Sequence, residues 1–234
     1  AANAPNHRGD ITLADAAAYK SVERPPISVI YRRHRVCGMG PPSSGGIAVA
    51  QTLKLLEPFD LGRGPEAALN PRAMHLIAEA EKLAFADRDY YIGDPDFVQV
   101  PLTLLDSDYL AARSQLINPN AAMPRPAPGT PPGVQRQAFG LDSTLESVGT
   151  SHFSVVDAEG NAVSMTTTIE SAFGSRVLAA GFLLNNELTD FSFLPTDAEG
   201  RPIANAVAPG KRPRSSMAPT IVFDDEGRLK AVLG

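Results

Sequence analysis

Prolines crowd the segment from residue 118 to residue 133, and they constrain the fold more than any other feature of this sequence. Proline lacks a backbone N–H and fixes φ, so a segment this rich in proline can form neither a helix nor a central strand. We expect it to be an extended or mobile connection. Helical patterns dominate the sequence before it and strand patterns dominate after it, which predicts an α+β fold.

Before this connection, apolar spacing predicts three helices and two short strands. The helices are expected at 12–20, 47–56 and 71–90, and the strands at 27–31 and 35–39. In the longest helix the inward stripe is predicted to be Met74, Ile77, Ala80, Ala84 and Phe85. The charged residues between them are predicted to lie mostly outside: Glu79, Glu81, Lys82 and Asp87.

The glycine-rich run 38–46 lies between a predicted strand and a predicted helix, which is the context of phosphate-binding loops. It lacks the Gly-Lys-Ser/Thr ending of such loops and does not fit the dinucleotide spacing. We interpret it as a tight strand-to-helix turn.

After the proline-rich segment, residues 151–156 and 162–169 alternate and are rich in β-formers, with the turn residues 157–161 between them. This pattern predicts a hairpin. Further strands are expected at 182–184, 220–223 and 229–233. The last of these runs into Gly234, so we expect the chain to be cut from something longer.

Composition excludes several classes of function. The 21 basic residues against 26 acidic ones argue against a nucleic-acid partner. No apolar run is long enough for a membrane span, and the first twenty residues lack the pattern of a signal peptide. The single Cys37 excludes an intramolecular disulfide. The histidines lack zinc-site spacing, and Thr168 stands where a calcium loop starting at Asp157 would need glutamate, so no metal or other cofactor is expected.

The pair Gly149–Thr150 stands at the start of the predicted hairpin and suits a self-processing site. The carbonyl of a glycine is unhindered, and the Thr150 hydroxyl can approach it. Cleavage of that bond would give Thr150 a free α-amine with a pKa of roughly 7.7–8.0. Such an amine can accept the proton of its own hydroxyl, so this nucleophile requires no histidine. Because Gly-Thr is a common pair, the pattern alone is weak, and its surroundings have to support it.

Motifs along most of the chain resemble the γ-glutamyltranspeptidase family. The small-subunit motifs are Thr150–Asp157 with Gly160–Val163, Leu183–Glu187 with Asp190–Ser192, and Lys211–Pro213 with Ser215–Met217 and Pro219–Thr220. The large-subunit motifs are Pro41–Gly46, Glu79–Lys82 and Gly93–Phe97. The resemblance implies part of an N-terminal-nucleophile hydrolase αββα sandwich. Residues 1–149 would be the C-terminal part of a large subunit, with the proline-rich linker at about 118–133. Residues 150–234 would be the N-terminal part of a small subunit of the same precursor.

The resemblance also implies roles for individual residues. Cleavage between Gly149 and Thr150 would free the nucleophile, and Thr168 would hydrogen-bond and orient it. Glu187 and Asp190 resemble an acidic pair that holds the substrate α-ammonium. Ser215 and Ser216 resemble the pair that receives the α-carboxylate. The substrate would be a γ-glutamyl amide such as glutathione, and the acyl-enzyme would be resolved by water or an amino-acid acceptor. Relatives in Gram-negative bacteria imply a periplasmic or extracellular location.

The sequence departs from the family in three ways. Glu170 replaces an asparagine near the α-amino group, so a third carboxylate would repel a substrate that presents only a carboxylate there. The segment between Asp190 and Ser215 is short and has no tyrosine for a lid, which favours hydrolysis over transfer. The oxyanion-hole glycines and the carboxylate-binding arginine are expected outside this chain, so this piece alone should be poorly active. Two alternatives stay open: an acylase of cephalosporin or glutaryl amides, and a non-catalytic relative that binds amino acids.

Overall fold

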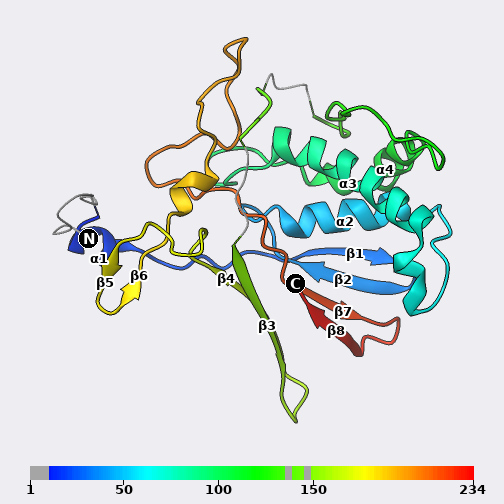
Figure 1. Ribbon diagram of the computed structural model, residues 1–234, viewed down its shortest axis with the longest axis horizontal. Coiled ribbons are helices and arrows are strands. Elements are labelled where there is room, and N and C mark those ends of the chain that lie inside the picture. The colour runs from blue at the N-terminus through cyan, green and yellow to red at the C-terminus, as the bar shows by residue number, and fades with distance from the viewer. Residues whose placement is uncertain (1–10, 135–138, 145–148) are drawn as a thin grey trace.

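A four-stranded antiparallel sheet forms the base of the computed structural model, which describes residues 11–134, 139–144 and 149–234. Its strands lie in the order β1 (Ile27–Tyr31), β2 (His34–Gly38), β7 (Thr220–Phe223) and β8 (Leu229–Leu233). The first and last parts of the described chain therefore share one sheet, because β2 pairs with β7. Figure 1 shows this sheet with the helices on one of its faces.

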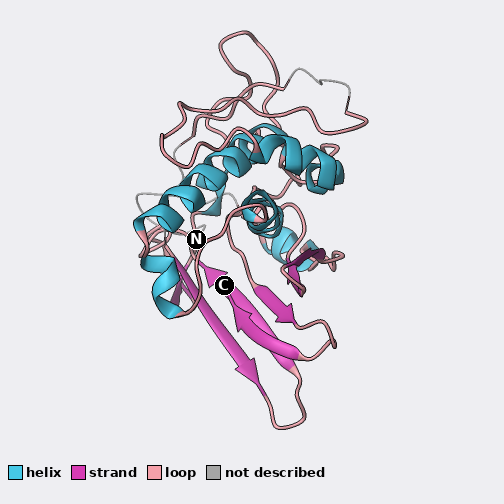
Figure 2. Cartoon of the chain, turned by 90° about the vertical axis from the view of Figure 1, so that its right-hand side faces the viewer, coloured by secondary structure: helices cyan, strands magenta, loops and turns pink. Residues whose placement is uncertain are grey.

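Helix α2 (Gly45–Leu56) packs on β1 and β2, and α3 (Pro71–Tyr91) and α4 (Ser107–Ser114) pack against α2. Figure 2 shows the helices stacked above the strands. Between them lies a core of fully buried aliphatic side chains that includes Ile47, Leu76, Leu83 and Leu110. Two helices, α2 and α3, appear where the apolar spacing predicts them. Helix α4 was missed, because its eight residues include two buried polar ones and give only a short apolar pattern.

The other elements are short. Helix α1 (Leu13–Ala18) begins with a capping box between Thr12 and Asp15. The 3-10 helices are η1 (Pro65–Leu69), η2 (Leu102–Leu105) and η3 (Glu187–Asp190), and a small hairpin joins β5 (Leu178–Ala179) to β6 (Phe182–Leu183). The glycine-rich run does form a tight turn, since β2 ends at Gly38 and α2 begins at Gly45.

The predicted hairpin is confirmed as β3 (Thr150–Val156) paired with β4 (Ala162–Thr168). Its side chains reach the end of the main sheet: Ser154 Oγ donates to the carbonyl of Val232 at 2.9 Å, and Ser164 Oγ donates to that of Leu233 at 2.9 Å. The described elements thus comprise a helical layer, a four-stranded sheet and two two-stranded hairpins. The α+β prediction is confirmed.

The predicted inner face of α3 is wrong in part. Met74 and Phe85 are exposed, whereas Glu79 and Asp87 are each only 1% exposed. The reason is the proline-rich segment, which has no helix or strand and donates backbone N–H groups to these two acids. Met123 N lies 2.6 Å from Glu79 Oε2, and Gly129 N lies 2.8 Å from Asp87 Oδ1. The segment is therefore extended, as predicted, and it is hydrogen-bonded to α3.

Asp87 also accepts hydrogen bonds from Gln51 and Tyr109 and lies 3.2 Å from the guanidinium of Arg113. Burial nevertheless keeps the pKa of Asp87 above its ordinary value. We expect Asp87→Asn to lower the free energy of unfolding by roughly 1.5–3 kcal/mol, because Arg113 loses its charged partner. Chemical denaturation would measure the change. The exposed acid Asp108 on α4 offers the control, and an equal loss in Asp108→Asn would contradict this account.

Candidate active site

Thr150 and Thr168 lie side by side at one end of the β3–β4 hairpin. They are paired residues in its register. The Thr168 hydroxyl donates a 2.5 Å hydrogen bond to the carbonyl oxygen of Gly149, the residue before Thr150. The backbone N–H of Glu170 donates in turn to Thr168 Oγ1 at 2.7 Å. These bonds form a relay from the Glu170 amide through Thr168 to the Gly149 carbonyl, and each donor strengthens the next.

Gly149 sits where no larger residue fits. A Cβ at this position would collide with the carbonyl oxygen of Glu170. Glu170 itself has a positive φ of 70°, a conformation that non-glycine residues seldom adopt. The backbone before Thr150 and the backbone after β4 thus pack closely against each other. This packing holds the Gly149 carbonyl next to the Thr168 hydroxyl.

Three carboxyl groups gather next to this pair. Glu187 and Asp190 are the ends of η3, and Glu170 interacts electrostatically with Glu187. Burial, the charge of Asp190, a hydrogen bond with Asp190 and the charge of Glu170 together raise the pKa of Glu187 to about 7. A site that holds its acids against mutual repulsion favours a bound cation, because a cation relieves that repulsion.

Glu170 has a second function within the protein. It is 5% exposed, and its Oε2 accepts hydrogen bonds from Ser171 Oγ at 2.8 Å and from the side-chain amide of Asn186. The Asn186 amide also bonds Thr189 Oγ1, so Glu170 helps to fix the loop that carries η3. Its charge acts on Glu187, while at least one of its oxygens is used to hold that loop.

Ser215 and Ser216 contact a different set of residues. Residue Ser43 forms a parallel bridge with Ser215, and the Ser215 carbonyl accepts hydrogen bonds from both the backbone N–H and the hydroxyl of Ser44, each at 2.7 Å. Gly45 permits this approach, since a Cβ there would collide with the carbonyl oxygen of Met217. Two motifs that are far apart in the sequence therefore meet at the N-terminus of α2.

Sequence reasoning missed several polar residues that support these groups. Buried Asn205 donates to the carbonyl of Asp190 at 2.7 Å and accepts from the backbone N–H of Arg214 at 2.9 Å. It thereby links the acidic group to the segment that carries the serine pair. Arg88 on α3 donates to Ser216 Oγ at 2.5 Å. No local pattern distinguishes Asn205, whereas Arg88 follows the quoted Glu79–Lys82 motif on the same helix.

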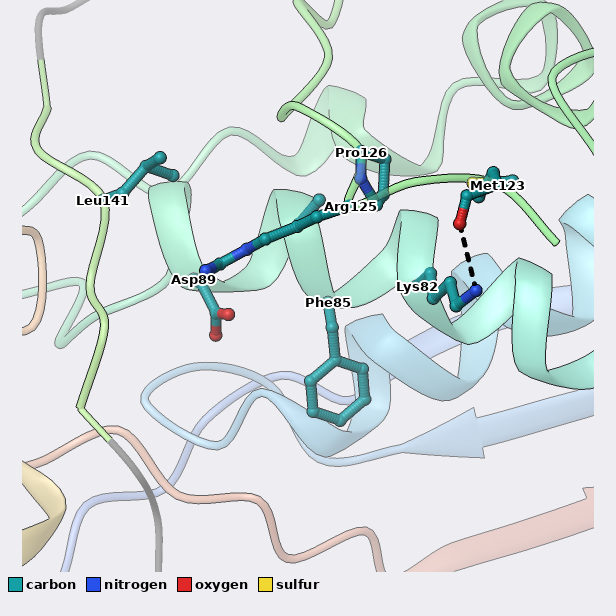
Figure 3. Close-up of a pocket in the computed structure, with 8 residues that line it drawn as sticks. Lys82, Phe85, Asp89, Met123, Arg125, Pro126 and Leu141 are labelled. Atoms are coloured by element: carbon teal, nitrogen blue, oxygen red, sulfur yellow. Dashed lines mark hydrogen bonds between the residues drawn. The ribbon is translucent and has the colours of Figure 1, made fainter.

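A separate pocket of about 360 Å³ lies on the outer face of α3. Figure 3 shows it between that helix and the proline-rich segment, with the hydrogen bond from Lys82 to the Met123 carbonyl at one side. Its lining includes Phe85, Asp89 and Arg125, and none of the residues predicted for the site lines it.

The described residues offer neither a cluster of metal ligands nor a helix that could cross a membrane. No three His, Cys, Asp or Glu side chains among them are placed to hold a metal ion. In the same part of the chain, no helix has the length and apolar character that a membrane crossing would need. The stretch 1–10, which includes His7 and half of the region inspected for a signal peptide, lies outside the described residues.

Comparison with known proteins shows the family to which the chain belongs. A sequence profile of the gamma-glutamyltranspeptidase family matches residues 1–234. The chain therefore belongs to the gamma-glutamyltranspeptidase family. A family member from Escherichia coli strain K12, named glutathione hydrolase proenzyme, is 45% identical over 233 residues, which is 97% of this chain and 38% of that protein. The acylase ACY 1 proenzyme of Pseudomonas sp. strain SE83 is 39% identical over 229 residues, covering 97% of this chain and 37% of that protein.

The fold agrees with this family assignment. The crystal structure of a cephalosporin acylase from Bacillus halodurans matches 96% of this chain and 36% of its own length, with a TM-score of 0.70 and 24% sequence identity. At that identity the match concerns the fold alone. The chain spans about two fifths of the length of the curated relatives it matches.

Proposed function

We propose that the protein containing this chain is a self-processing N-terminal-threonine enzyme that cleaves γ-glutamyl amides such as glutathione. The observation that carries the proposal is the hydrogen bond from Thr168 to the carbonyl of Gly149, the residue before Thr150. A donor aimed at that carbonyl favours attack on it, because it stabilises the negative charge that develops on the oxygen.

Self-cleavage would begin with the Thr150 oxygen attacking the carbonyl carbon of Gly149. The C–N bond to Thr150 breaks as the C–O bond forms, and the hydroxyl proton moves to the released amine. Water then hydrolyses the ester, leaving a carboxylate on Gly149 and restoring the Thr150 hydroxyl. With Gly149 released, the Thr168 hydroxyl can turn to Thr150 and orient it.

Turnover would use the same oxygen. The α-amine of Thr150 takes the hydroxyl proton while Thr150 attacks the γ-amide carbonyl of the donor. The leaving amine departs with that proton, and an ester of the γ-glutamyl group remains on Thr150. Water, or the amine of an amino-acid acceptor, then displaces the ester and regenerates the free threonine.

The polar groups nearby suit a donor that carries both an ammonium and a carboxylate. Glu187 and Asp190 would hold the α-ammonium, with the charge of Glu170 behind them, and Ser215 and Ser216 would receive the α-carboxylate. A donor bound the other way round, with its α-carboxylate beside the acids, is unfavourable because the acids would repel that carboxylate. We propose hydrolysis as the dominant outcome because residues 191–214 contain no tyrosine to cover the pocket.

After cleavage the two pieces would stay together. Residues 1–149 would belong to the large subunit and residues 150–234 to the small subunit, and they already share the sheet through the β2–β7 pairing. A buried ion pair between Asp142 and Arg214, 3.1 Å apart, joins the two pieces.

A comparison of two donors tests this function in the protein expressed from its full gene. We expect the anilide of γ-glutamate to be hydrolysed at least roughly tenfold faster, in kcat/KM, than the glutaryl anilide, which lacks the α-amine. Adding an amino-acid acceptor should raise the rate only modestly if water dominates. A preference for the glutaryl donor would favour the acylase alternative, and an uncut, inactive protein would favour the non-catalytic binding protein.

The raised pKa of Glu187 predicts a pH dependence. Below about 7 the folded protein keeps Glu187 protonated, and above it the carboxylate is ionised and attracts an ammonium. The KM for the γ-glutamyl donor should therefore fall as the pH rises through 7, while the KM for the glutaryl donor should rise. Kinetics from pH 5.5 to 8.5 would measure both trends. In Glu187→Gln the two trends should flatten, and a persistent trend would assign the titration to another group.

A further inference from the structure

Arg88 joins the serine pair to helices α2 and α3. Arg88 is 3% exposed, and its guanidinium donates to side chains that include Ser44, Ser216 and Asp89. Nε donates to Ser44 Oγ at 2.8 Å, Nη2 to Ser216 Oγ at 2.5 Å, and Nη1 to Asp89 Oδ1 at 2.9 Å. The planar guanidinium fixes the angles between these bonds, which the flexible ammonium of a lysine cannot do.

The bond to Ser44 determines where Ser215 lies. A serine hydroxyl has one proton and two lone pairs. Ser44 Oγ accepts from Arg88 with a lone pair and gives its proton to the Ser215 carbonyl at 2.7 Å. The backbone carbonyl of Ser215 is thus held from α3 through a chain of two hydrogen bonds, in addition to the direct bond from the Ser44 amide.

The bond to Ser216 determines how that hydroxyl can meet an anion. Since Ser216 Oγ accepts from Arg88, its proton points away from the guanidinium. A hydroxyl that accepts from a cation is polarised and becomes a stronger donor. An anion attracts the proton and not the lone pair, so Arg88 orients Ser216 as a donor for a carboxylate.

We propose that Arg88 is a positioning residue for the recognition of the donor α-carboxylate, acting through Ser216 and, by way of Ser44, through Ser215. This inference rests on the proposed function, because it assumes that the serine pair meets the α-carboxylate. It makes Arg88 a determinant of specificity that lies outside the serine motif and does not itself touch the donor.

Arg113 provides a matched control on the neighbouring helix α4. It is 8% exposed, lies 3.2 Å from Asp87 and donates to the carbonyls of Leu83 and Ala127. It is therefore a buried arginine with a structural role, and its hydrogen bonds and ion pair reach other groups than the two serines. Comparing Arg88→Met with Arg113→Met separates the loss of a buried arginine from the loss of serine positioning.

The test compares three anilide donors on the full-length enzyme, followed as substrates or, for a slow donor, as competitive inhibitors. They are the γ-glutamyl, glutaryl and 4-aminobutanoyl anilides, of which the last keeps the amine and lacks the carboxylate. In Arg88→Met we expect KM for the two carboxylate donors to rise roughly tenfold to a hundredfold, while KM for the 4-aminobutanoyl donor stays within about twofold. Arg113→Met should change no ratio between donors.

Arg88→Lys gives a second readout if Arg88→Met does not fold. It keeps the charge and loses the fixed directions, so the ratio of KM between γ-glutamyl and 4-aminobutanoyl donors should rise by an intermediate factor. If the ratio of KM between these donors equalled that of the wild type, or if KM changed equally for all three donors, the role of Arg88 would be overturned. Wild-type protein that cleaves itself yet turns over no γ-glutamyl donor would instead overturn the proposed function.

Discussion

Replacing Thr150 with alanine in the full-length protein is expected to leave one uncut polypeptide with no measurable turnover of γ-glutamyl amides. The Thr150 oxygen would be the nucleophile in both reactions, and alanine has no atom to replace it. Loss of a catalytic nucleophile lowers kcat by roughly 10⁴-fold or more. Intact mass after incubation near neutral pH would measure cleavage, and release of the anilide would measure turnover.

Neighbouring threonines supply the controls for this experiment. Thr150→Ser keeps a hydroxyl and should still cleave, at a reduced rate. Thr168→Ala removes the donor to the Gly149 carbonyl and should slow cleavage by about 100- to 1000-fold. Thr167 is exposed and lies on the opposite face of the same strand, so Thr167→Ala should behave as the wild type. Efficient cleavage before residue 150 in Thr150→Ala would remove Thr150 from both roles.

Local patterns were sufficient for the elements whose stability is local. The hairpin β3–β4 has alternating residues and a turn rich in Asp, Gly and Asn, so its two strands followed from the sequence. Helix α3 was placed correctly from its apolar spacing and from Pro71 in its first turn. The orientation of its acids was predicted wrongly, because Glu79 and Asp87 each accept a hydrogen bond from the proline-rich segment, more than 40 positions away.

In the candidate site, too, local motifs predicted some residues, whereas others depend on contacts between distant parts of the chain. The family motifs contain Thr150, Glu187, Asp190 and both serines, and the resemblance adds Thr168. The structure gathers the threonines and the acids at one end of the hairpin. Asn205 and Arg88 could not be found in this way, since their importance comes from groups that the fold brings to them. A buried polar residue has no local signature when all its partners are distant in sequence.

Replacing Asp190 with asparagine is expected to weaken recognition of the donor amine more than it affects the chemical step. A hydrogen bond to a charged group contributes about 1.5–3 kcal/mol, which corresponds to roughly a tenfold to hundredfold rise in KM for γ-glutamyl donors. The glutaryl donor should bind as well as before or better, because one repelling charge is removed. Steady-state kinetics with both donors would measure the two effects.

The same substitution should move the titration of its neighbour. Asp190 is the second cause of the raised pKa of Glu187, after burial, so its removal should lower that pKa from about 7 toward its ordinary 4.5. The fall of KM with rising pH would then occur at lower pH. Glu199 is an exposed acid paired with Arg201, and Glu199→Gln removes the same charge from a distant loop. If Asp190→Asn and Glu199→Gln gave the same donor preference and the same pH profile, Asp190 would have no place in amine recognition.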